Sequence, residues 1–468
     1  MINKMYYRLT KNIALRKWKY VDRAIYFRNM DCASSVSKEE FELLLLCDGK
    51  HDITPSPFLA NLLSWGYIEE CQKDEEPSNW SLLKEYDNYY FPRMNLMITG
   101  KCNLNCLHCF NAKDNAPLNS ELSYEQIIDI LDQARDIGVH AFTLTGGEPL
   151  VHPRFLDIVR AIYERDMIIF ELNTNGLLLN QKMLDVFKEL KCYPLIKISF
   201  DGVGYHNIIR QHPKAEDLTI KAIKLCIENG FRVKAQVQVN RKNVDVMMDT
   251  ARLLNDLGVN EMRIIRTTEA PRWEKNSPQS SLTIEEYYES MLKFSKEYIN
   301  SDMDMVIDIW QFIRLYPREK MYSLVAIACS KDEFNIRIPM CKGNRGMIAV
   351  SSSGEVVPCL QMSGYFIEHK ISLGNLFKTP LKELVKESDY LNLATAPLFR
   401  QIVENDKCAN CKYYKACNGG CPALGLLYSK DINFFHEDIT KCIFFENGWY
   451  DKVNNELKEW RLEKQLDI

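Results

Sequence analysis

The stretch Gly100-Lys101-Cys102-Asn103-Leu104-Asn105-Cys106-Leu107-His108-Cys109 decides how the rest of this chain is interpreted. It follows a predicted strand at 95–99 and places three thiols within eight residues. Three thiolates at a strand-to-loop transition can hold one face of an iron-sulfur cubane and leave its fourth iron open. The two alternatives are a structural zinc site and three buried cysteines that only pack in the core. Structural zinc usually takes four ligands in paired short spacings, and a buried trio on a helix would follow helical spacing.

The sequence around this stretch alternates between strands and amphipathic helices. Strands are predicted at 95–99, 141–145, 168–172, 197–200, 232–239 and 262–265. Helical runs lie between them, such as 124–137, where Ser123 and Gln126 form a capping box. The alternation predicts an α/β fold whose parallel sheet has about six β/α units, with ligands at the C-terminal ends of the strands.

The spacing Cys102-x-x-x-Cys106-x-x-Cys109 resembles the motif of radical S-adenosylmethionine (SAM) enzymes, with His108 where that family commonly has an aromatic residue. The resemblance implies a partial (β/α)6 barrel and a 4Fe-4S cluster whose open iron is chelated by SAM. It also implies that the reduced cluster cleaves SAM to a 5'-deoxyadenosyl radical, which abstracts hydrogen from carbon. The first cysteine motif therefore predicts an enzyme.

The same resemblance implies further cofactor contacts at the strand ends. The predicted cofactor-binding residues are His108, Gly146, Gly147, Glu148, Asn173, Asn175, Ser199 and Arg210. Glycines after the second strand would let backbone carbonyls approach the methionine ammonium. The asparagines after the third strand offer short polar side chains to the ribose, and Ser199 with Arg210 resembles the pair that binds the carboxylate or ribose. Taken alone, the glycines and asparagines also fit ordinary turns, and Arg210 fits a surface position.

A second group of cysteines begins at Cys341 and is similar to the SPASM domain, which carries two auxiliary clusters in peptide- and protein-modifying radical enzymes. Pro358-Cys359 and Leu373-Gly374-Asn375-Leu376 also resemble that domain. The resemblance assigns the outer cluster to Cys408, Cys411, Cys417 and Cys442, and the inner cluster to Cys341, Cys359 and Cys421. Either Cys329 is the fourth inner ligand or that iron is open. Two zinc sites are the alternative.

The N-terminal segment predicts a winged-helix-like module, with strands at 6–9, 13–18 and 24–27 followed by two helices. Ser37 and Glu40 form a capping box for the first helix, and Gly66 ends the second. Residues 1–30 contain eight Lys or Arg and one acid, which suits an extended peptide added at a sheet edge or simply a solvated basic face. The order resembles the element that grips leader sequences of ribosomal peptides. DNA binding is disfavoured because the second helix, 58–65, has no Lys or Arg.

Length and composition set the outer limits of these interpretations. The 468 residues, 46% of them hydrophobic, predict several domains, and the net charge of -4 gives no sign of nucleic-acid binding. No apolar run has the length of a signal peptide or membrane span, so we expect a cytoplasmic protein with no membrane partner. The predicted domains are the recognition module at 1–72, a linker at 73–92, the radical SAM partial barrel at 93–270, a bridging region at 271–340 and the cysteine-rich SPASM domain at 341–468.

Together these patterns predict a radical SAM maturase that uses three 4Fe-4S clusters and SAM. Its substrate would be a ribosomally made precursor peptide with a leader, in which it forms a thioether or carbon-carbon cross-link. An electron donor such as flavodoxin or ferredoxin would be a second partner. The alternatives are a maturase of a protein, such as a sulfatase, and an iron-sulfur electron-transfer protein, although the Gly-Gly-Glu-Pro sequence argues against the latter.

Overall fold

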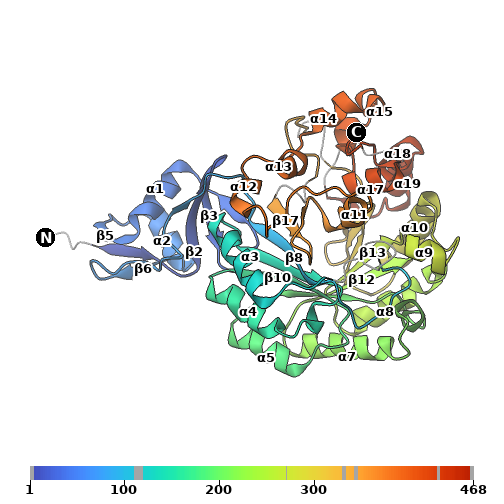
Figure 1. Ribbon diagram of the computed structural model, residues 1–468, viewed down its shortest axis with the longest axis horizontal. Helices are drawn as coiled ribbons and strands as arrows, with labels where there is room; N and C mark the ends of the chain where they lie inside the picture. Colours follow the sequence, from blue (N-terminus) through green and yellow to red (C-terminus); the bar gives the residue numbers. More distant parts are fainter. Residues whose placement is uncertain are drawn as a thin grey trace.

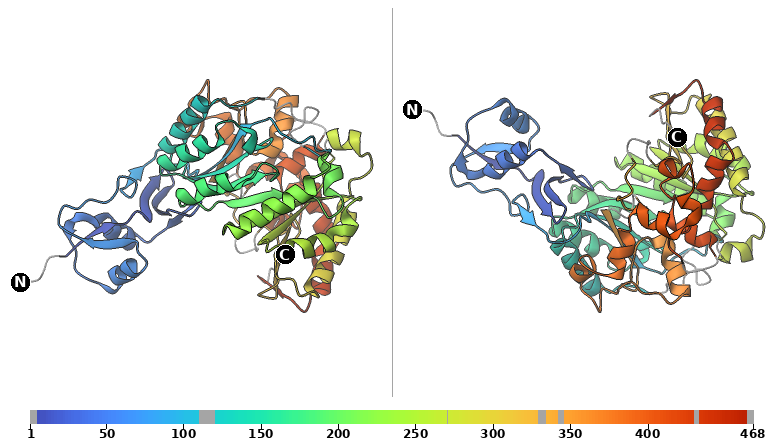
Figure 2. Two further views of the ribbon diagram at one scale, coloured as in Figure 1. Left: turned by 90° about the horizontal axis from the view of Figure 1, so that it is seen from below. Right: turned by 90° about the horizontal axis from the view of Figure 1, so that it is seen from above.

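The computed structural model describes residues 5–109, 120–269, 271–328, 334–341, 346–429 and 433–463. Figure 1 shows a central sheet with helices α3, α4, α5, α7 and α8 on one side and the C-terminal helices on the other. The N-terminal module projects from one end of this body, as both views of Figure 2 also show. No helix in the described part of the chain is long and apolar enough to cross a membrane.

Six neighbouring parallel strands form the middle of the sheet, in sequence order. They are β8 (Arg93–Thr99), β9 (Ala141–Gly146), β10 (Ile168–Thr174), β11 (Leu195–Ser199), β12 (Val233–Val239) and β13 (Glu261–Arg266). The crossover helices are α3 (Tyr124–Asp136), α4 (Phe155–Glu164), α5 (Gln181–Glu189), α7 (Ala215–Glu228) and α8 (Met247–Asp256), with the short α6 (His206–Arg210), η1 (Pro149–Val151) and η2 (Val244–Val246) at loops. The capping box at Ser123 is present. The predicted partial barrel of β/α units is confirmed.

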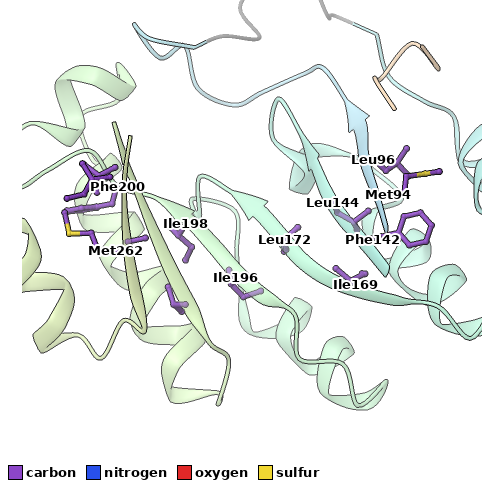
Figure 3. Packing of buried hydrophobic residues seen from close by; sticks show 14 of the residues in the cluster. Met94, Leu96, Phe142, Leu144, Ile169, Leu172, Ile196, Ile198, Phe200 and Met262 are labelled. Carbon is purple, nitrogen blue, oxygen red and sulfur yellow. The ribbon is translucent and has the colours of Figure 1, made fainter. Parts of the chain in front are cut away.

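The core lies between this sheet and the crossover helices. Alternate residues of each strand, among them Leu96, Leu144, Leu172 and Ile198, are fully buried there (Figure 3). The intervening residues point to the other face of the sheet because side chains of a strand alternate. On that face many of these residues are polar, which leaves a hydrophilic interior opposite the helices.

The sheet continues beyond the six strands at both edges. At one edge lie β14 (Val306–Ile309), which is parallel to β13, then β15 (Ile313–Tyr316), β16 (Met321–Leu324) and β19 (Arg461–Leu462). At the other edge β17 (Met347–Val350) pairs in parallel with β8, followed by β18 (Val356–Val357). Within the described residues the sheet has 12 strands. The bridging and C-terminal regions are therefore joined to the barrel by backbone hydrogen bonds, an arrangement that the sequence did not predict.

The bridging region also contributes α9 (Pro271–Asn276) and α10 (Ile284–Ile299), and the capping box at Thr283 opens α10. The C-terminal region consists mostly of short helices. These are η4 (Leu360–Met362), α11 (Ser363–Glu368), α12 (Leu381–Leu384), α13 (Asp389–Ala394), α14 (Leu398–Glu404), α15 (Asp406–Ala409), α16 (Tyr414–Cys417), α17 (Pro422–Tyr428), α18 (Ile439–Glu446) and α19 (Trp449–Glu456). They cover the polar face of the sheet (Figure 1).

The N-terminal module contains two small sheets in the described part of the chain. Strands β1 (Tyr6–Leu9), β5 (Asp48–Asp52) and β6 (Ile68–Cys71) form the distal sheet, and β2 (Ile13–Trp18), β3 (Val21–Phe27), β4 (Ala33–Ser35) and β7 (Lys84–Glu85) form the proximal sheet. Helices α1 (Lys38–Leu46) and α2 (Pro57–Ser64) pack on the distal sheet. The Ser37 capping box is present, and Gly66 has a φ of 67°.

The proximal sheet is packed firmly against the barrel. Trp18 Nε1 donates to the Ile137 carbonyl at 3.3 Å, and the Tyr26 hydroxyl donates to the Gly138 carbonyl at 3.1 Å. The segment predicted as a linker at 73–92 takes part in this packing, since Trp80 is buried and Arg16 donates to its carbonyl at 2.8 Å. The lack of apolar periodicity in residues 73–92 does not make this segment an unpacked linker, because single aromatic residues such as Trp80 bury it.

Candidate active site

A cavity of about 920 Å³ lies on the polar face of the sheet. All three cysteines of the first motif line it, together with His108, Gly146, Gly147, Glu148, Asn173, Asn175, Ser199 and Arg210. Cys341, Cys359 and Cys421 of the C-terminal region line it as well. The structure therefore brings the first cysteine motif, every predicted cofactor residue and the predicted inner-cluster cysteines to one cavity.

The loop that carries the first cysteine motif is held in place from three directions. Asn175 Nδ2 donates to Asn103 Oδ1 at 2.7 Å, which ties the loop to the end of β10. Arg272 Nε on α9 donates to the Cys106 carbonyl at 2.9 Å, and the Leu107 amide donates to the Ile209 carbonyl at 2.9 Å. These tethers fix a segment that has no regular secondary structure of its own.

Gly146, which ends β9, and Gly147, which follows it, are required by close packing against this same loop. A Cβ at Gly147 would lie 2.3 Å from the Lys101 carbonyl oxygen, and one at Gly146 would lie 2.5 Å from the Thr99 carbonyl oxygen. The Gly147 amide donates to the Thr99 carbonyl at 2.7 Å. Both positions therefore require glycine because of contacts within the protein, in addition to the predicted approach of the cofactor.

Glu148 is buried, and it fastens the end of β10 to the turn after β9. Its carboxylate accepts hydrogen bonds from the Asn175 amide at 2.7 Å, the Thr174 hydroxyl at 2.8 Å and the Leu150 amide at 3.1 Å. Burial raises its pKa to about 7 despite these donors. Glu148 therefore positions neighbouring backbone, a role that the sequence interpretation as a cofactor contact did not include.

Arg210 is buried beside the first cysteine motif. Its Nη1 lies 3.6 Å from Cys106 Sγ, and its Nε lies 2.6 Å from Asp201 Oδ2. Asp201 Oδ1 lies 3.5 Å from His108 Nε2. Burial alone would raise the pKa of Asp201, but the charges of Arg210 and His108 outweigh it and hold the pKa well below its usual value. The guanidinium of Arg210 is thereby held at the sulfur of a predicted cluster ligand by a buried carboxylate.

The remaining predicted cofactor residues differ in how much hydrogen-bonding capacity they have left. The Asn175 side chain donates a hydrogen bond to Asn103 Oδ1 and accepts one from the Leu177 amide at 3.0 Å. Asn173 Oδ1 is buried and has no hydrogen-bond partner in the described residues. A buried acceptor without a partner is costly unless a ligand satisfies it. Asn173 therefore fits a polar ligand in the cavity better than Asn175 does.

The four predicted outer-cluster cysteines surround a second, small cavity of about 20 Å³. Cys408 lies on α15, Cys417 ends α16, Cys442 lies on α18, and Cys411 lies in the turn between α15 and α16. Burial raises the pKa of the Cys408 thiol to about 12 and that of Cys442 to about 11. Four thiols around one enclosed space fit a cluster with no open iron, and their deprotonation would accompany its binding.

The predicted inner-cluster cysteines form an incomplete set in the described residues. Cys341, Cys359 and Cys421 face the large cavity, and the Cys421 amide donates to Asp438 Oδ2 at 2.9 Å. Burial raises the pKa of the Cys359 thiol to about 11. Cys329 lies outside the described residues, so the choice between a fourth thiol and an open iron stays a prediction.

The spacing of these side chains gives no support to mononuclear zinc. In the described ranges, no three His, Cys, Asp or Glu side chains lie close enough to hold one metal ion. A cubane with four irons takes its thiolates from a wider space than a single tetrahedral zinc. The donor sets at both cavities thus fit iron-sulfur clusters.

Several residues at the two cavities were missed by the sequence reasoning. Asp201 and Arg272 hold the first site together, and Lys441 lines both cavities while its Nζ donates to the Ala326 carbonyl at 2.8 Å. Asp201 stands two residues after Ser199, which was a usable signal. Arg272 and Lys441 belong to unremarkable charged stretches, and nothing in the sequence distinguishes them.

Comparison with known proteins agrees with this geometry. Residues 96–266 match the radical SAM superfamily, and residues 341–417 match SPASM, an iron-sulfur cluster-binding domain. The chain contains a radical SAM domain and a SPASM domain, and it is a radical SAM enzyme. It therefore uses 4Fe-4S chemistry and SAM.

Particular relatives and structures resemble most of the chain. The AdoMet-dependent heme synthase of Methanosarcina barkeri is 24% identical over 356 residues, 74% of this chain and 95% of the relative. The antilisterial bacteriocin subtilosin biosynthesis protein AlbA of Bacillus subtilis is 26% identical over 337 residues, 71% of this chain and 67% of AlbA. SuiB of Streptococcus suis, crystallised with precursor peptide SuiA, has the same fold, with a TM-score of 0.63 at 15% identity over 93% of this chain and 99% of SuiB.

Proposed function

We propose that this enzyme is a maturase that abstracts hydrogen from a residue of a ribosomally made precursor peptide and forms a thioether or carbon-carbon cross-link. The observation that carries the proposal is the single cavity shared by the first cysteine motif and the inner-cluster cysteines. Its volume of about 920 Å³ lies in the upper range of ligand pockets, enough for a cofactor and part of a peptide. AlbA and SuiB, whose names connect them with bacteriocin and precursor peptides, support this substrate class.

The residues of this chain prepare the site in several ways. A bound cluster and SAM would supply a 5'-deoxyadenosyl radical that takes hydrogen from carbon. Cys102, Cys106 and Cys109 would hold the cluster, and Arg210 Nη1 lies 3.6 Å from Cys106 Sγ. Asn173 offers a free acceptor to the cofactor. The C-terminal helices lie over the face of the sheet that lines the cavity, which would protect the reaction from water.

Two further clusters would complete the electron path. We assign the outer one to the four cysteines of the small cavity and the inner one to Cys341, Cys359 and Cys421, with Cys329 as the candidate fourth ligand. Cys417 lines both cavities, so the two sites adjoin. A flavodoxin or ferredoxin would deliver electrons to this enzyme.

The N-terminal module would bind the leader of the peptide. The SuiB match supports this assignment. It covers 93% of this chain, and that share must include part of residues 1–72. The module is less basic than its sequence suggests, since Arg8 pairs with Glu69 at 2.7 Å and Lys17 with Glu85 at 2.9 Å. We therefore expect backbone and apolar contacts to contribute more than charge to leader binding.

The proposal is tested by incubating the reconstituted enzyme anaerobically with SAM, a reductant and each short peptide found by inspecting the reading frames that neighbour its gene. We expect formation of 5'-deoxyadenosine and a peptide product lighter by two hydrogen atoms. Removal of the leader from the peptide should greatly reduce turnover, and a separate leader peptide should compete with the full precursor. Cleavage of SAM without any change in the peptide would overturn the proposal, and absence of cleavage would favour a simple electron carrier.

Leader competition is a cleaner test than deletion of the module from the enzyme. Deleting residues 1–70 would remove Trp18 and Tyr26, which cover the barrel at Ile137 and Gly138. Loss of activity after such a deletion would therefore report damage to the barrel as well as lost recognition.

A further inference from the structure

A row of polar side chains crosses the face of the sheet that lines the large cavity. Its members are direct register partners on neighbouring strands from β11 to β16, and they are Ser199, Gln236, Arg263, Asp308, Arg314 and Ser323. Register partners share one face of a sheet. All except Asp308 line the cavity. The row thus begins at a predicted cofactor residue and leads away from it along the cavity wall.

The two arginines of this row have unused hydrogen-bonding capacity. Arg263 Nε lies 3.6 Å from Asp308 Oδ2, and Arg314 Nη2 donates to Glu261 at 3.0 Å. The Nε groups of both arginines are buried and have no hydrogen-bond partner in the described residues. A buried donor without a partner is unfavourable, so these two groups point to a ligand that accepts hydrogen bonds.

The charges around the row also favour an anion. Lys234 joins the network, with its Nζ 2.5 Å from Glu261 and 3.7 Å from Asp308. Three cations thus face two carboxylates, which leaves one positive charge in excess. Among the described residues that line the cavity, Glu148 is the only acid, and its oxygens are occupied by the donors described above.

We propose that Arg263 and Arg314 bind a carboxylate of the substrate, so that the peptide segment in the cavity is acidic. This inference rests on the proposed function. Arg263 lies two strands from Ser199, a separation of about 10 Å at the usual strand spacing. An extended peptide covers that separation with about three residues. The carboxylate should therefore lie about three residues from the residue that loses hydrogen.

The test measures binding of short acetylated peptides to the reconstituted, SAM-loaded full-length enzyme by fluorescence anisotropy. Three amidated peptides carry Glu, Gln or Lys at one position, and a fourth carries Gln with a free C-terminal carboxylate. We expect the Glu peptide to bind about tenfold more tightly than the amidated Gln peptide, because a charge-assisted pair is replaced by neutral contacts. Tight binding of the fourth peptide would instead identify a C-terminal carboxylate as the bound group.

Arginine variants test which side chains cause the preference for the Glu peptide. Arg263→Gln and Arg314→Gln should each remove the preference for Glu over Gln, and Arg263→Lys should retain part of it because the charge remains without the planar fork. Arg318→Gln is the matched control, since Arg318 is exposed and pairs with Asp304 at 2.7 Å outside the cavity. Iron content and the thermal midpoint show whether each variant is folded.

Equal binding of all four peptides, or a Glu preference that survives in both Gln variants, would overturn the inference. The binding assay requires no turnover, so its result can contradict the inference without contradicting the proposed function. An enzyme that modifies its precursor but has no acidic preference contradicts only the inference. An enzyme that prefers Glu but modifies no peptide contradicts only the proposed function.

Discussion

The first cysteine site and the outer cysteine site have different surroundings although both are rich in thiols. The first site has three cysteines on an irregular loop and faces a cavity of about 920 Å³. The outer site has four cysteines, three of them on short helices, around a space of about 20 Å³. A cation stands at each: Arg210 beside Cys106, and Lys441 at the wall of the outer cavity.

This difference separates two uses of the same ligand. A three-thiol site next to a large cavity leaves an iron for a substrate or cofactor, whereas a closed four-thiol site can only exchange electrons or stabilise the fold. The first loop depends on distant tethers such as Arg272 and Asn175. The outer cysteines are instead held by the local helices that carry them.

Substitution of any first-site cysteine should abolish reductive cleavage of SAM. Cys102→Ala, Cys106→Ala or Cys109→Ala leaves two thiolates, and two cannot hold a cubane with a single open iron. The measurement is 5'-deoxyadenosine formed by the anaerobically reconstituted protein. Cys32→Ala is the control, because Cys32 is exposed and belongs to neither site. Cleavage retained in any of the three variants would contradict the assignment.

Substitution of two outer-site cysteines should have the opposite pattern. The double variant Cys408→Ala/Cys411→Ala leaves two thiolates at that site and should lower the iron content by about one third, if three clusters are present, while SAM is still cleaved. Iron analysis and product analysis of the same preparation check both parts. If cleavage is lost with full iron content at the first site, the outer site takes part in cofactor chemistry and the division is wrong. Zinc in place of iron would also contradict it.

The packing of the first loop can be disturbed without removing a ligand. Gly147→Ala places a Cβ 2.3 Å from the Lys101 carbonyl oxygen, and such overpacking costs about 1–3 kcal/mol. SAM cleavage should fall about tenfold while the iron of the auxiliary sites is retained. Gly230→Ala is the control for general destabilisation, because a φ of 83° strains an alanine there while nothing lies within 4 Å of a Cβ. Equal activity of the two variants would show that loop position is unimportant.

The buried carboxyl of Glu148 predicts a pH dependence of stability that belongs to the first site. The unfolded chain loses this proton near pH 4.5, whereas the folded protein retains it to about pH 7. The unfolded state therefore binds fewer protons between these values, and stability falls as the pH rises, by about 3 kcal/mol. Thermal midpoints of wild type and Glu148→Gln from pH 4 to pH 8 test this. Parallel curves would contradict the raised pKa.

The sequence predicted the features that depend on neighbours in the chain. Capping boxes at Ser37 and Ser123 lie at helix starts because their hydrogen bonds span three residues. The period of apolar residues predicted six β/α units, because each strand must bury one face under a helix. Cysteine spacing predicted the radical SAM and SPASM domains for a similar reason, since ligands of one cluster must lie within reach of one another.

Only the tertiary structure decided the contacts between distant segments. The parallel pairing of β17 with β8, the packing of residues 73–92 and the clamp of Arg272 on the first loop join positions far apart in the chain. Arg210 was left between a cofactor contact and a surface arginine, and its place beside Cys106 and Asp201 depends on how α6 packs against the loop. The sequence did not predict the row of polar register partners from β11 to β16, for the same physical reason. Register between strands is set by packing across the whole sheet, and no single strand records which residue will stand beside it.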